Sequence, residues 1–419
     1  MMLNELPRLL ADFKPLPGVL KADYEDFVVE ELPLYPADDA GTHVYFQLEK
    51  RGLSTMQAVA DVARALGVAK RDIGYAGLKD ARAVTRQWMS VEHVPKDRLL
   101  ALEIPRLKIL DVKLHGNKLR LGHLRANRFN IKVRQFDENR FGELRNAFER
   151  LIAVGCPNYF GEQRFGSRGD SWQVGQALLA GNADEAIDAM LGRPAPDDQP
   201  ALKQARTLYE QGQFQPASRA WPAMFTTERR VLRALMSNRG KKRRAIFAIE
   251  PHIRRLYTSA FQSHLFNQVV AARLPHGLAR LMVGDLAFLH ANGAVFRVID
   301  LTAEQPRADK GEISPTGPLF GYRMTRPADE PLHIEQSVFS AAGLDADSFQ
   351  ARGLNVKGSR RALRFLVAES QIELGADRRG PYLEFRFCLP KGCYATSLLR
   401  EFIDTAPPEE ESGAELDNE

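Results

Sequence analysis

The chain has 419 residues, 44% of them hydrophobic and 26% charged, which excludes a disordered or fibrous protein and allows two or three globular domains. The formal net charge is +5, but the last fourteen residues hold six carboxylates and no cation, so the remaining 405 residues carry +11. This basic body favours a polyanionic partner, and without a recognisable secretory signal or a long apolar run we expect a cytoplasmic protein that does not enter a membrane.

The first part of the chain alternates between strand and helix patterns. Residues 20–32 and 42–52 combine aromatic and β-branched residues with partial alternation, which predicts strands. A helix should follow between Ser54, a suitable N-cap, and Gly67, a suitable stop, because apolar residues recur there at i, i+3 and i+7. The loop 74–87 then leads into a further strand.

Residues 107–136 contain two strand-like runs that meet at Gly116–Asn117, which predicts a hairpin. A helical pattern over 138–155 follows. Since strands outnumber helices here and short turns join several of them, the expected fold class is α+β with a mixed, largely antiparallel sheet.

The pattern changes after residue 156, and strand character returns near residue 360. We therefore expect a discontinuous domain of residues 1–156 and 358–405, interrupted by a mostly helical domain at 157–357. The acidic residues 406–419 are expected to form a disordered tail that either damps non-specific contacts or serves solubility alone. The helical segments expected in the interruption are 172–191, 201–212, 227–237 and 252–273.

A basic cluster lies within the helical part, in "RGKKRRAIFAIEPHIRR" (239–255), which has seven Lys or Arg and one Glu. Such a cluster is typical of contacts with nucleic-acid phosphates, which supply affinity rather than sequence choice. The alternative is an ordinary solvated helix face. The residues predicted to meet phosphates are Lys241, Lys242, Arg243 and Arg244.

The stretch "GYAGLKDARAVTRQ" (74–87) places Asp80 among Lys79, Arg82 and Arg86 in a glycine-bearing turn. A carboxylate that must stay ionised while it faces something negatively charged needs such cations. The alternative is a polar turn in which Asp80 is only a cap.

Known cofactor motifs are missing from the sequence. There is no G-x-G-x-x-G after a strand, P-loop, G-x-S-x-G or H-E-x-x-H motif. The three cysteines, Cys156, Cys388 and Cys393, form no C-x-x-C pair and fit reduced thiols better than disulfides or structural zinc. We expect neither a metal nor a cofactor.

Four stretches join an aromatic residue to polar or basic neighbours: "DFVVEEL", "NRFNIKV", "PNYFGEQRFG" and "GCYATSLLRE". Aromatic rings beside amides and cations suit a pocket that stacks and hydrogen-bonds an extruded base. Each ring taken singly is more often part of a core, and alternation alone would bury Phe129.

Five motifs together, in order, resemble the TruD family of tRNA pseudouridine synthases: "GYAGLKDARAVTRQ", "LRANRFNIKVR", "PNYFGEQRFG", "SAFQSHLFN" and "LPKGCYATSLLRE". The resemblance covers nearly the whole chain. It implies a pseudouridine synthase catalytic fold with an inserted, mostly helical α/β TRUD domain. It also implies isomerisation of uridine to pseudouridine in tRNA, at position 13 in the D arm, by a monomer that needs no cofactor, metal or protein partner.

The resemblance makes Asp80 the nucleophile of this reaction, and it leaves open whether Asp80 attacks the anomeric carbon or ring carbon 6. A cation must hold this carboxylate ionised, and Lys21 on the first strand is the predicted charge partner. Lys79 should point away from Asp80 if the two are extended neighbours. Arg82 and Arg86 are then predicted to contact RNA phosphates. The residues predicted to bind the uracil are Phe27, Asn127, Phe129 and Tyr394.

Two other functions remain open from the sequence. A tRNA-binding module without catalysis would keep the fold, and a nucleobase hydrolase would use the same carboxylate but release free uracil. An intact Asp80 argues against the first, and the products of the reaction distinguish the second.

Overall fold

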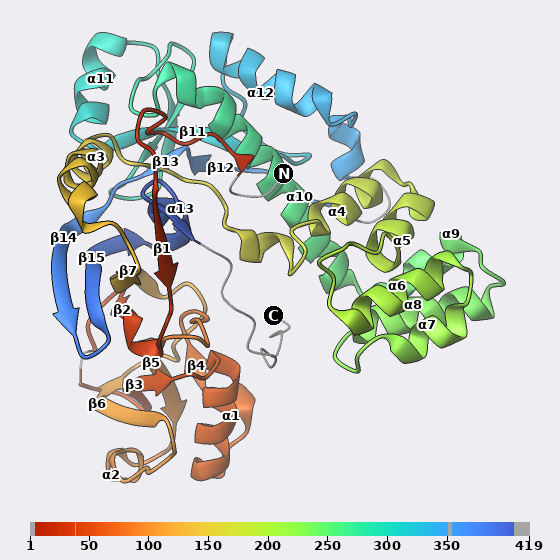
Figure 1. Ribbon diagram of the computed structural model, residues 1–419, viewed down its shortest axis with the longest axis horizontal. Helices are drawn as coiled ribbons and strands as arrows, with labels where there is room; N and C mark the ends of the chain where they lie inside the picture. The colour runs from red at the N-terminus through yellow and green to blue at the C-terminus, as the bar shows by residue number, and fades with distance from the viewer. Residues whose placement is uncertain (1–4, 38, 351–353, 406–419) are drawn as a thin grey trace. The chain divides into compact units, whose positions relative to one another are not determined.

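The computed structural model describes residues 5–37, 39–350 and 354–405, which form two compact units (Figure 1). The sheet unit comprises Arg8–Cys156 and the chain from Phe365 onward. The inserted unit comprises Pro157–Arg364 and the N-terminal residues up to Pro7. The acidic tail at 406–419 lies outside the described residues. No helix within the described ranges is both long enough and apolar enough to cross a membrane.

Ten strands of the described residues form the sheet of the sheet unit. The main path runs β14-β15-β7-β2-β5-β3-β6; β4 pairs with β5, and β1 pairs with both β7 and β16. The pairs β2–β5 and β1–β16 are parallel and the others antiparallel, so the predicted α+β class with a mixed, largely antiparallel sheet is confirmed. The strands are β1 (Leu16–Leu20), β2 (Phe27–Pro33), β3 (His43–Arg51), β4 (Gly74–Tyr75), β5 (Val84–Glu92), β6 (Leu107–His115), β7 (Leu124–Arg134), β14 (Ala368–Asp377), β15 (Gly380–Pro390) and β16 (Ile403–Thr405).

The predicted hairpin at Gly116–Asn117 is wrong. β6 ends at His115 and β7 begins at Leu124, as the pattern suggested, but β6 pairs with β3 whereas β7 pairs with β2 and β15. The residues between the two strands cross the sheet instead of making a tight turn. The error has a physical reason: strand runs report local backbone preference, but the partner of a strand is decided by non-local packing.

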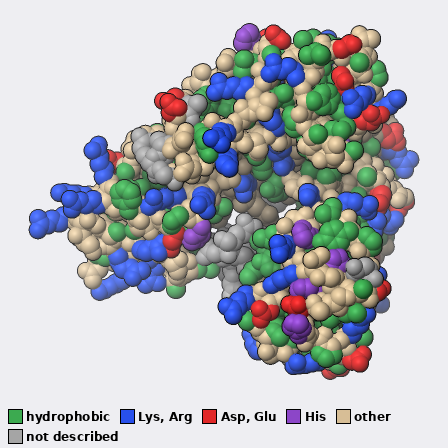
Figure 2. All heavy atoms as spheres, turned by 180° about the vertical axis from the view of Figure 1, so that it is seen from behind, with side chains coloured by type: hydrophobic (Ala, Val, Ile, Leu, Met, Phe, Trp, Pro, Cys, Tyr) green, Lys and Arg blue, Asp and Glu red, His purple; other side chains and the backbone are tan. Residues whose placement is uncertain are grey.

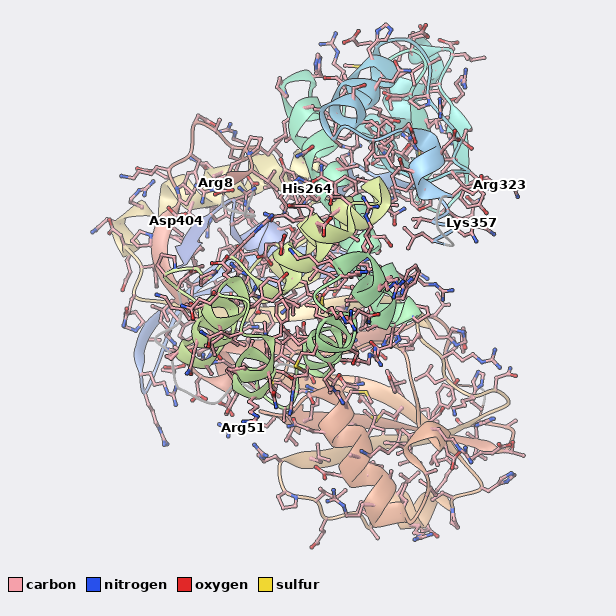
Figure 3. The ribbon with its side chains drawn as sticks, turned by 90° about the vertical axis from the view of Figure 1, so that its right-hand side faces the viewer. Arg8, Arg51, His264, Arg323, Lys357 and Asp404 are labelled. Carbon is pink, nitrogen blue, oxygen red and sulfur yellow. The ribbon has the colours of Figure 1, made fainter. Side chains whose placement is uncertain are left out.

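Both ends of the sheet unit meet in the same place. β16 lies beside β1, with Leu16 opposite Ile403. Next to this pair, Arg8 Nη2 lies 2.5 Å from Asp404 Oδ1 (Figure 3). The first and last strands of this unit are thus neighbours in one sheet.

Helices of the sheet unit cover one face of the sheet. The predicted helix is confirmed as α1 (Thr55–Leu66), which a capping box between Ser54 and Gln57 begins and Gly67, at φ 68°, ends. Its apolar side packs on the apolar residues of β3 and β5. A second core joins the same sheet to α3 (Phe141–Val154) and α13 (Ala395–Leu399). The short helix α2 (Lys96–Leu100) precedes β6.

The opposite face of the sheet carries a row of charged side chains that pair with one another. Glu30, Arg86 and Glu49 lie side by side on β2, β5 and β3, and Arg128 on β7 pairs with Glu30. Their neighbours in sequence, such as Val29 and Thr85, are buried under the helices. This alternation assigns each strand residue to one of the two faces.

The inserted unit has two parts. Helices α4 to α9 and the start of α10 form a helical lobe, which packs around a core that contains Ile187, Trp221 and Leu232. The second part contains a four-stranded antiparallel sheet, β10-β9-β11-β12, and the remaining helices. The helices are α4 (Ser171–Ala180), α5 (Ala183–Leu191), α6 (Pro200–Glu210), α7 (Phe214–Ala220), α8 (Thr226–Ser237), α9 (Lys242–Ala245), α10 (Pro251–Arg273), α11 (Leu301–Asp309) and α12 (Asp329–Ala341); the strands are β9 (Leu286–Leu289), β10 (Val295–Arg297), β11 (Ile313–Leu319) and β12 (Ser359–Ala362). The chain passes between the units at β8 (Cys156–Pro157) and β13 (Arg364–Phe365).

Candidate active site

Asp80 lies in the loop between β4 and β5, and its carboxylate forms an ion pair with Lys21. The distance from Lys21 Nζ to Asp80 Oδ2 is 3.1 Å, and the two side chains are 25% and 30% exposed. The same ammonium lies 4.3 Å from the centre of the Phe27 ring. Lys21 follows β1 directly with a left-handed backbone, at φ 56°. A half-buried cation so close to the carboxylate stabilises its ionised form.

Lys50 binds the backbone of the loop that carries Asp80. This lysine is fully buried at the end of β3, and its ammonium donates hydrogen bonds to the carbonyl oxygens of Asp80 (2.7 Å) and Lys79 (3.3 Å) as well as to that of Leu53. A buried ammonium costs several kcal/mol of desolvation, which well-placed carbonyl oxygens must offset. Lys50 therefore fixes the backbone that carries Asp80.

Lys50 is not among the residues predicted from the sequence, although a signal for it was present. In the strand "HVYFQLEKR", Val44, Phe46, Leu48 and Lys50 alternate onto one face, and the first three are apolar. A lysine at an inward position of an otherwise apolar face is a buried charge, and such charges are seldom without a partner or a role.

A buried ion pair holds the residue before Asp80. Lys79 Nζ lies 2.7 Å from Glu31 Oε2, with side chains only 6% and 1% exposed. Burial raises the pKa of the Glu31 carboxyl, and the nearby Lys79 ammonium opposes that rise. The backbone N–H of Lys79 also donates to the hydroxyl of Thr55, which in turn donates to Gln87. Lys79 thus points into the sheet unit, as expected, and leaves Asp80 to Lys21.

The two phenylalanines predicted to bind uracil lie in the hydrophobic core, where Phe27 contacts Lys21. Phe27 is 3% exposed and Phe129 is 8% exposed. Their rings meet edge to face, with centres 6.3 Å apart, and Phe129 also stacks on Phe387 at 5.3 Å. With Lys21 over one face of Phe27, both rings form a packed wall of the site.

Asn127 and Tyr394 are more accessible. Asn127 is half-buried on β7, where it lies opposite Glu31 on β2 and Leu389 on β15. Its Oδ1 atom is buried and has no hydrogen-bond partner among the described residues. Tyr394 is half-buried just after β15, at the start of α13. A buried acceptor without a donor is uncommon in folded proteins, and a ligand is one way to satisfy it.

Arg82 and Arg86 are not equivalent. Arg82 is exposed in the loop of Asp80. Arg86 lies on the charged face of the sheet, opposite the face that holds Lys21 and Phe27, and its Nε atom is 2.8 Å from Glu49 Oε2. The sequence could not show this face, because the register of β5 assigns it. Arg86 has a carboxylate partner but a side chain that is 42% exposed, so its contact with RNA phosphates stays a prediction.

The four basic residues of the inserted unit also differ. Lys241, Arg243 and Arg244 are exposed, whereas Lys242 donates a 2.5 Å hydrogen bond to Asp188, which also accepts one from the Tyr209 hydroxyl. At the left of Figure 2, lysines and arginines cover much of the visible face of this helical lobe. Three of the four side chains are thus available to phosphates, and Lys242 has a structural partner.

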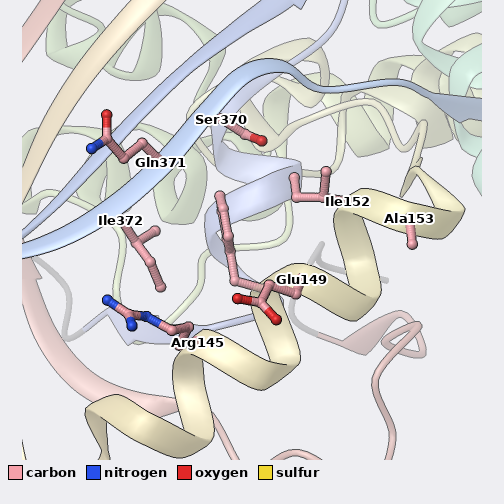
Figure 4. A pocket seen from close by; sticks show the side chains of 8 residues that line it. Arg145, Glu149, Ile152, Ala153, Ser370, Gln371 and Ile372 are labelled. Carbon is pink, nitrogen blue, oxygen red and sulfur yellow. The ribbon is translucent and has the colours of Figure 1, made fainter.

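A cavity lies elsewhere in the sheet unit. It has a volume of about 360 Å³ and lies between α3 and β14, where Arg145, Glu149 and Gln371 line it (Figure 4). None of the predicted site residues lines it. Among the described residues, no group of three or more His, Cys, Asp or Glu side chains is arranged to hold a metal ion.

Comparisons with known proteins converge on one family. The family model described as tRNA pseudouridine synthase D (TruD) matches residues 5–402. A tRNA pseudouridine synthase D from Geobacter metallireducens is 43% identical over 409 residues, covering 97% of this chain and 100% of the relative. One from Geobacter sulfurreducens is 43% identical over 396 residues, covering 94% and 96%. A crystal structure from Methanosarcina mazei, provisionally described as tRNA pseudouridine synthase D, superposes with a TM-score of 0.83 at 26% identity and 96% coverage of both chains.

Proposed function

The chain belongs to the tRNA pseudouridine synthase D (TruD) family, and from this premise we propose that Asp80 is the nucleophile that isomerises uridine 13 in the D arm of tRNA. The pseudouridine synthase fold and the activity on tRNA follow from the family; the nucleophile and the position are the proposal. The observation that supports it is the ion pair between Asp80 and Lys21. The buried lysines Lys50 and Lys79 hold the loop that carries Asp80 in place.

The reaction requires a carboxylate that is ionised and fixed. Asp80 attacks either the anomeric carbon or ring carbon 6, the bond between the ribose and N1 of uracil breaks, and the uracil turns to present carbon 5. A new bond then joins carbon 5 to the anomeric carbon of the ribose, and the bond to Asp80 breaks, which restores the carboxylate. The proton of carbon 5 leaves, and N1 gains a proton. Lys21 stabilises the charged carboxylate, and Lys50 fixes its position through the backbone.

Asn127 and Tyr394 are the proposed uracil ligands. The unpartnered Oδ1 atom of Asn127 suits the N–H of a uracil edge, which a base rotated into the site supplies. Tyr394 offers its ring for stacking. Phe27 and Phe129 support the pocket from the core, since both are too buried to receive a base face to face without moving.

The two units divide the work in this proposal. The sheet unit is the catalytic domain, and the inserted unit is the TRUD domain, which grips the tRNA body through Lys241, Arg243 and Arg244. Arg82 contacts phosphates beside the target uridine. The protein acts in the cytoplasm as a monomer, without metal, cofactor or obligatory protein partner; light scattering of the purified chain measures the oligomeric state.

The direct test is to incubate the protein with unmodified tRNA and map pseudouridine by chemical adducts that stop reverse transcription. The proposal expects one stop, at position 13. A stop at another position removes the assignment of the D arm but keeps the activity. Release of free uracil indicates the hydrolase, and tight binding without any product indicates the non-catalytic module.

A further inference from the structure

Phe247 is an aromatic residue that the fold turns outward. It lies in the short 3₁₀ turn Ile246–Ala248, next to α9, and its side chain is 73% exposed. The flanking residues Ala245 and Ile249 are completely buried in the core of the helical lobe. Most of the Phe247 side chain therefore contributes nothing to the core of the lobe.

Arg254, on α10, holds the ring in place. Its guanidinium lies 5.5 Å from the centre of the Phe247 ring. The same guanidinium donates hydrogen bonds to the carbonyl oxygens of Ile249 (2.9 Å) and Ile246 (3.2 Å), which flank Phe247 in the turn. The ring is therefore presented in a fixed orientation, with a cation at one side and most of its surface open to solvent.

The chain segment that contains Phe247 is strongly cationic. Six exposed Lys or Arg side chains occur between residues 233 and 255, and the only acid in that range, Glu250, pairs with Arg230. Among the described residues, none of the six lies within ion-pair distance of a carboxylate; they are Arg233, Arg239, Lys241, Arg243, Arg244 and Arg255. An isolated aromatic ring within a cationic surface complements a partner that carries both phosphates and flat rings.

We propose that Phe247 is a stacking platform for an unpaired base of the bound tRNA. This inference rests on the proposed tRNA function, and it adds a second kind of contact to the inserted unit. The cations bind phosphates anywhere on the tRNA, whereas Phe247 needs an open ring face, which bases paired inside a helix do not expose. The lobe thereby distinguishes a loop or bulge from a plain duplex.

The test compares Phe247→Ala, Phe247→Trp and the unaltered chain by filter binding of unmodified tRNA at several salt concentrations. Stacking is worth about 1–3 kcal/mol per base, so Phe247→Ala should weaken affinity roughly 5- to 150-fold, and Phe247→Trp should restore it. Stacking releases no counterions, so the slope of log affinity against log salt should stay unchanged. A blunt RNA duplex should bind the Ala variant as well as it binds the unaltered chain.

Ile299→Ala is the matched control, because Ile299 is 79% exposed in the same unit but lies outside the basic cluster. The proposal is overturned if Phe247→Ala binds tRNA as tightly as the unaltered chain, or if it loses duplex binding equally. An unchanged affinity for tRNA combined with a lost affinity for anionic vesicles would assign the ring to a membrane surface. Because Phe247→Ala should keep its full rate at saturating tRNA, failure here is distinct from failure of Asp80 as nucleophile.

Discussion

Two cation-rich regions of this protein use lysine and arginine in opposite ways. Around Asp80, Lys50 is completely buried, the Lys79 side chain is 6% exposed, and each has a fixed partner. In the helical lobe, Lys241, Arg243 and Arg244 are exposed and no carboxylate of the described residues pairs with them. Buried cations fix geometry, and exposed cations supply affinity. Under the proposed function, burial rather than residue type separates the cations that support catalysis from those that bind tRNA.

The largest effect within this comparison is expected for Lys50→Met. The substitution leaves the buried carbonyl oxygens of Asp80 and Lys79 without this donor, at a cost of about 1–3 kcal/mol each, and lets the loop that carries Asp80 shift. The single-turnover rate at saturating tRNA should fall at least about a hundredfold, while tRNA affinity is unchanged. Lys50→Gln, which keeps N–H donors, should recover part of the rate.

Lys132→Met is the matched control for Lys50. Lys132 lies on β7 of the same sheet unit, where its Nζ atom is 3.1 Å from Asp377 on the charged face. The rate of this variant should equal that of the unaltered chain. If Lys50→Met and Lys132→Met lower the melting temperature and the rate by equal amounts, Lys50 contributes only to general stability.

The next effect is expected for Tyr394, which is half-buried at the start of α13. Loss of one stacking contact worth about 1–3 kcal/mol should lower the rate of Tyr394→Ala roughly ten- to a hundredfold with the fold intact. Tyr394→Phe should be active, because the ring is retained. An inactive Phe variant would instead give the hydroxyl a part in the chemistry.

A smaller effect, confined to affinity, is expected for the exposed cations. Replacing Lys241, Arg243 and Arg244 by glutamine should leave the rate at saturating tRNA unchanged. Each lost phosphate contact should reduce the slope of log affinity against log salt by about 0.9 or less. Filter binding at several salt concentrations measures this slope.

Lys242→Gln is the smallest change and sharpens the comparison. Because Lys242 donates to Asp188 beside Tyr209, we expect it to contribute little to phosphate binding. Its substitution should leave the salt slope unchanged and lower the melting temperature slightly. A slope that changes as much as for Arg243→Gln would show that partnered and free cations bind RNA alike.

The sequence predicted a large part of this arrangement. The α+β class, the helix from Ser54 to Gly67 and the pairing of Lys21 with Asp80 depend on local patterns or motifs, and the structure shows each of them. The predicted helix over 172–191 is in fact two helices, α4 and α5, because Gly181 takes a left-handed conformation at φ 70°. The glycine was visible, but apolar periodicity continued across it.

The features that the sequence did not predict share a physical cause. The face on which Arg86 lies and the partner of β6 both depend on strand register, which non-local packing determines. The burial of Lys50 follows from the same register. The roles of Asp80, Asn127 and Tyr394 stay predictions, since position alone does not establish chemistry.

The most direct test of the account is Asp80→Asn, with tRNA affinity by filter binding and pseudouridine formation from tritium-labelled uridine measured on one preparation. The amide keeps the size of the side chain but removes its charge and nearly all of its nucleophilicity. We predict that product falls below detection, while affinity stays equal or rises slightly because a negative charge near the RNA is gone. A turnover near that of the unaltered chain would contradict the account and remove Asp80 from the chemistry.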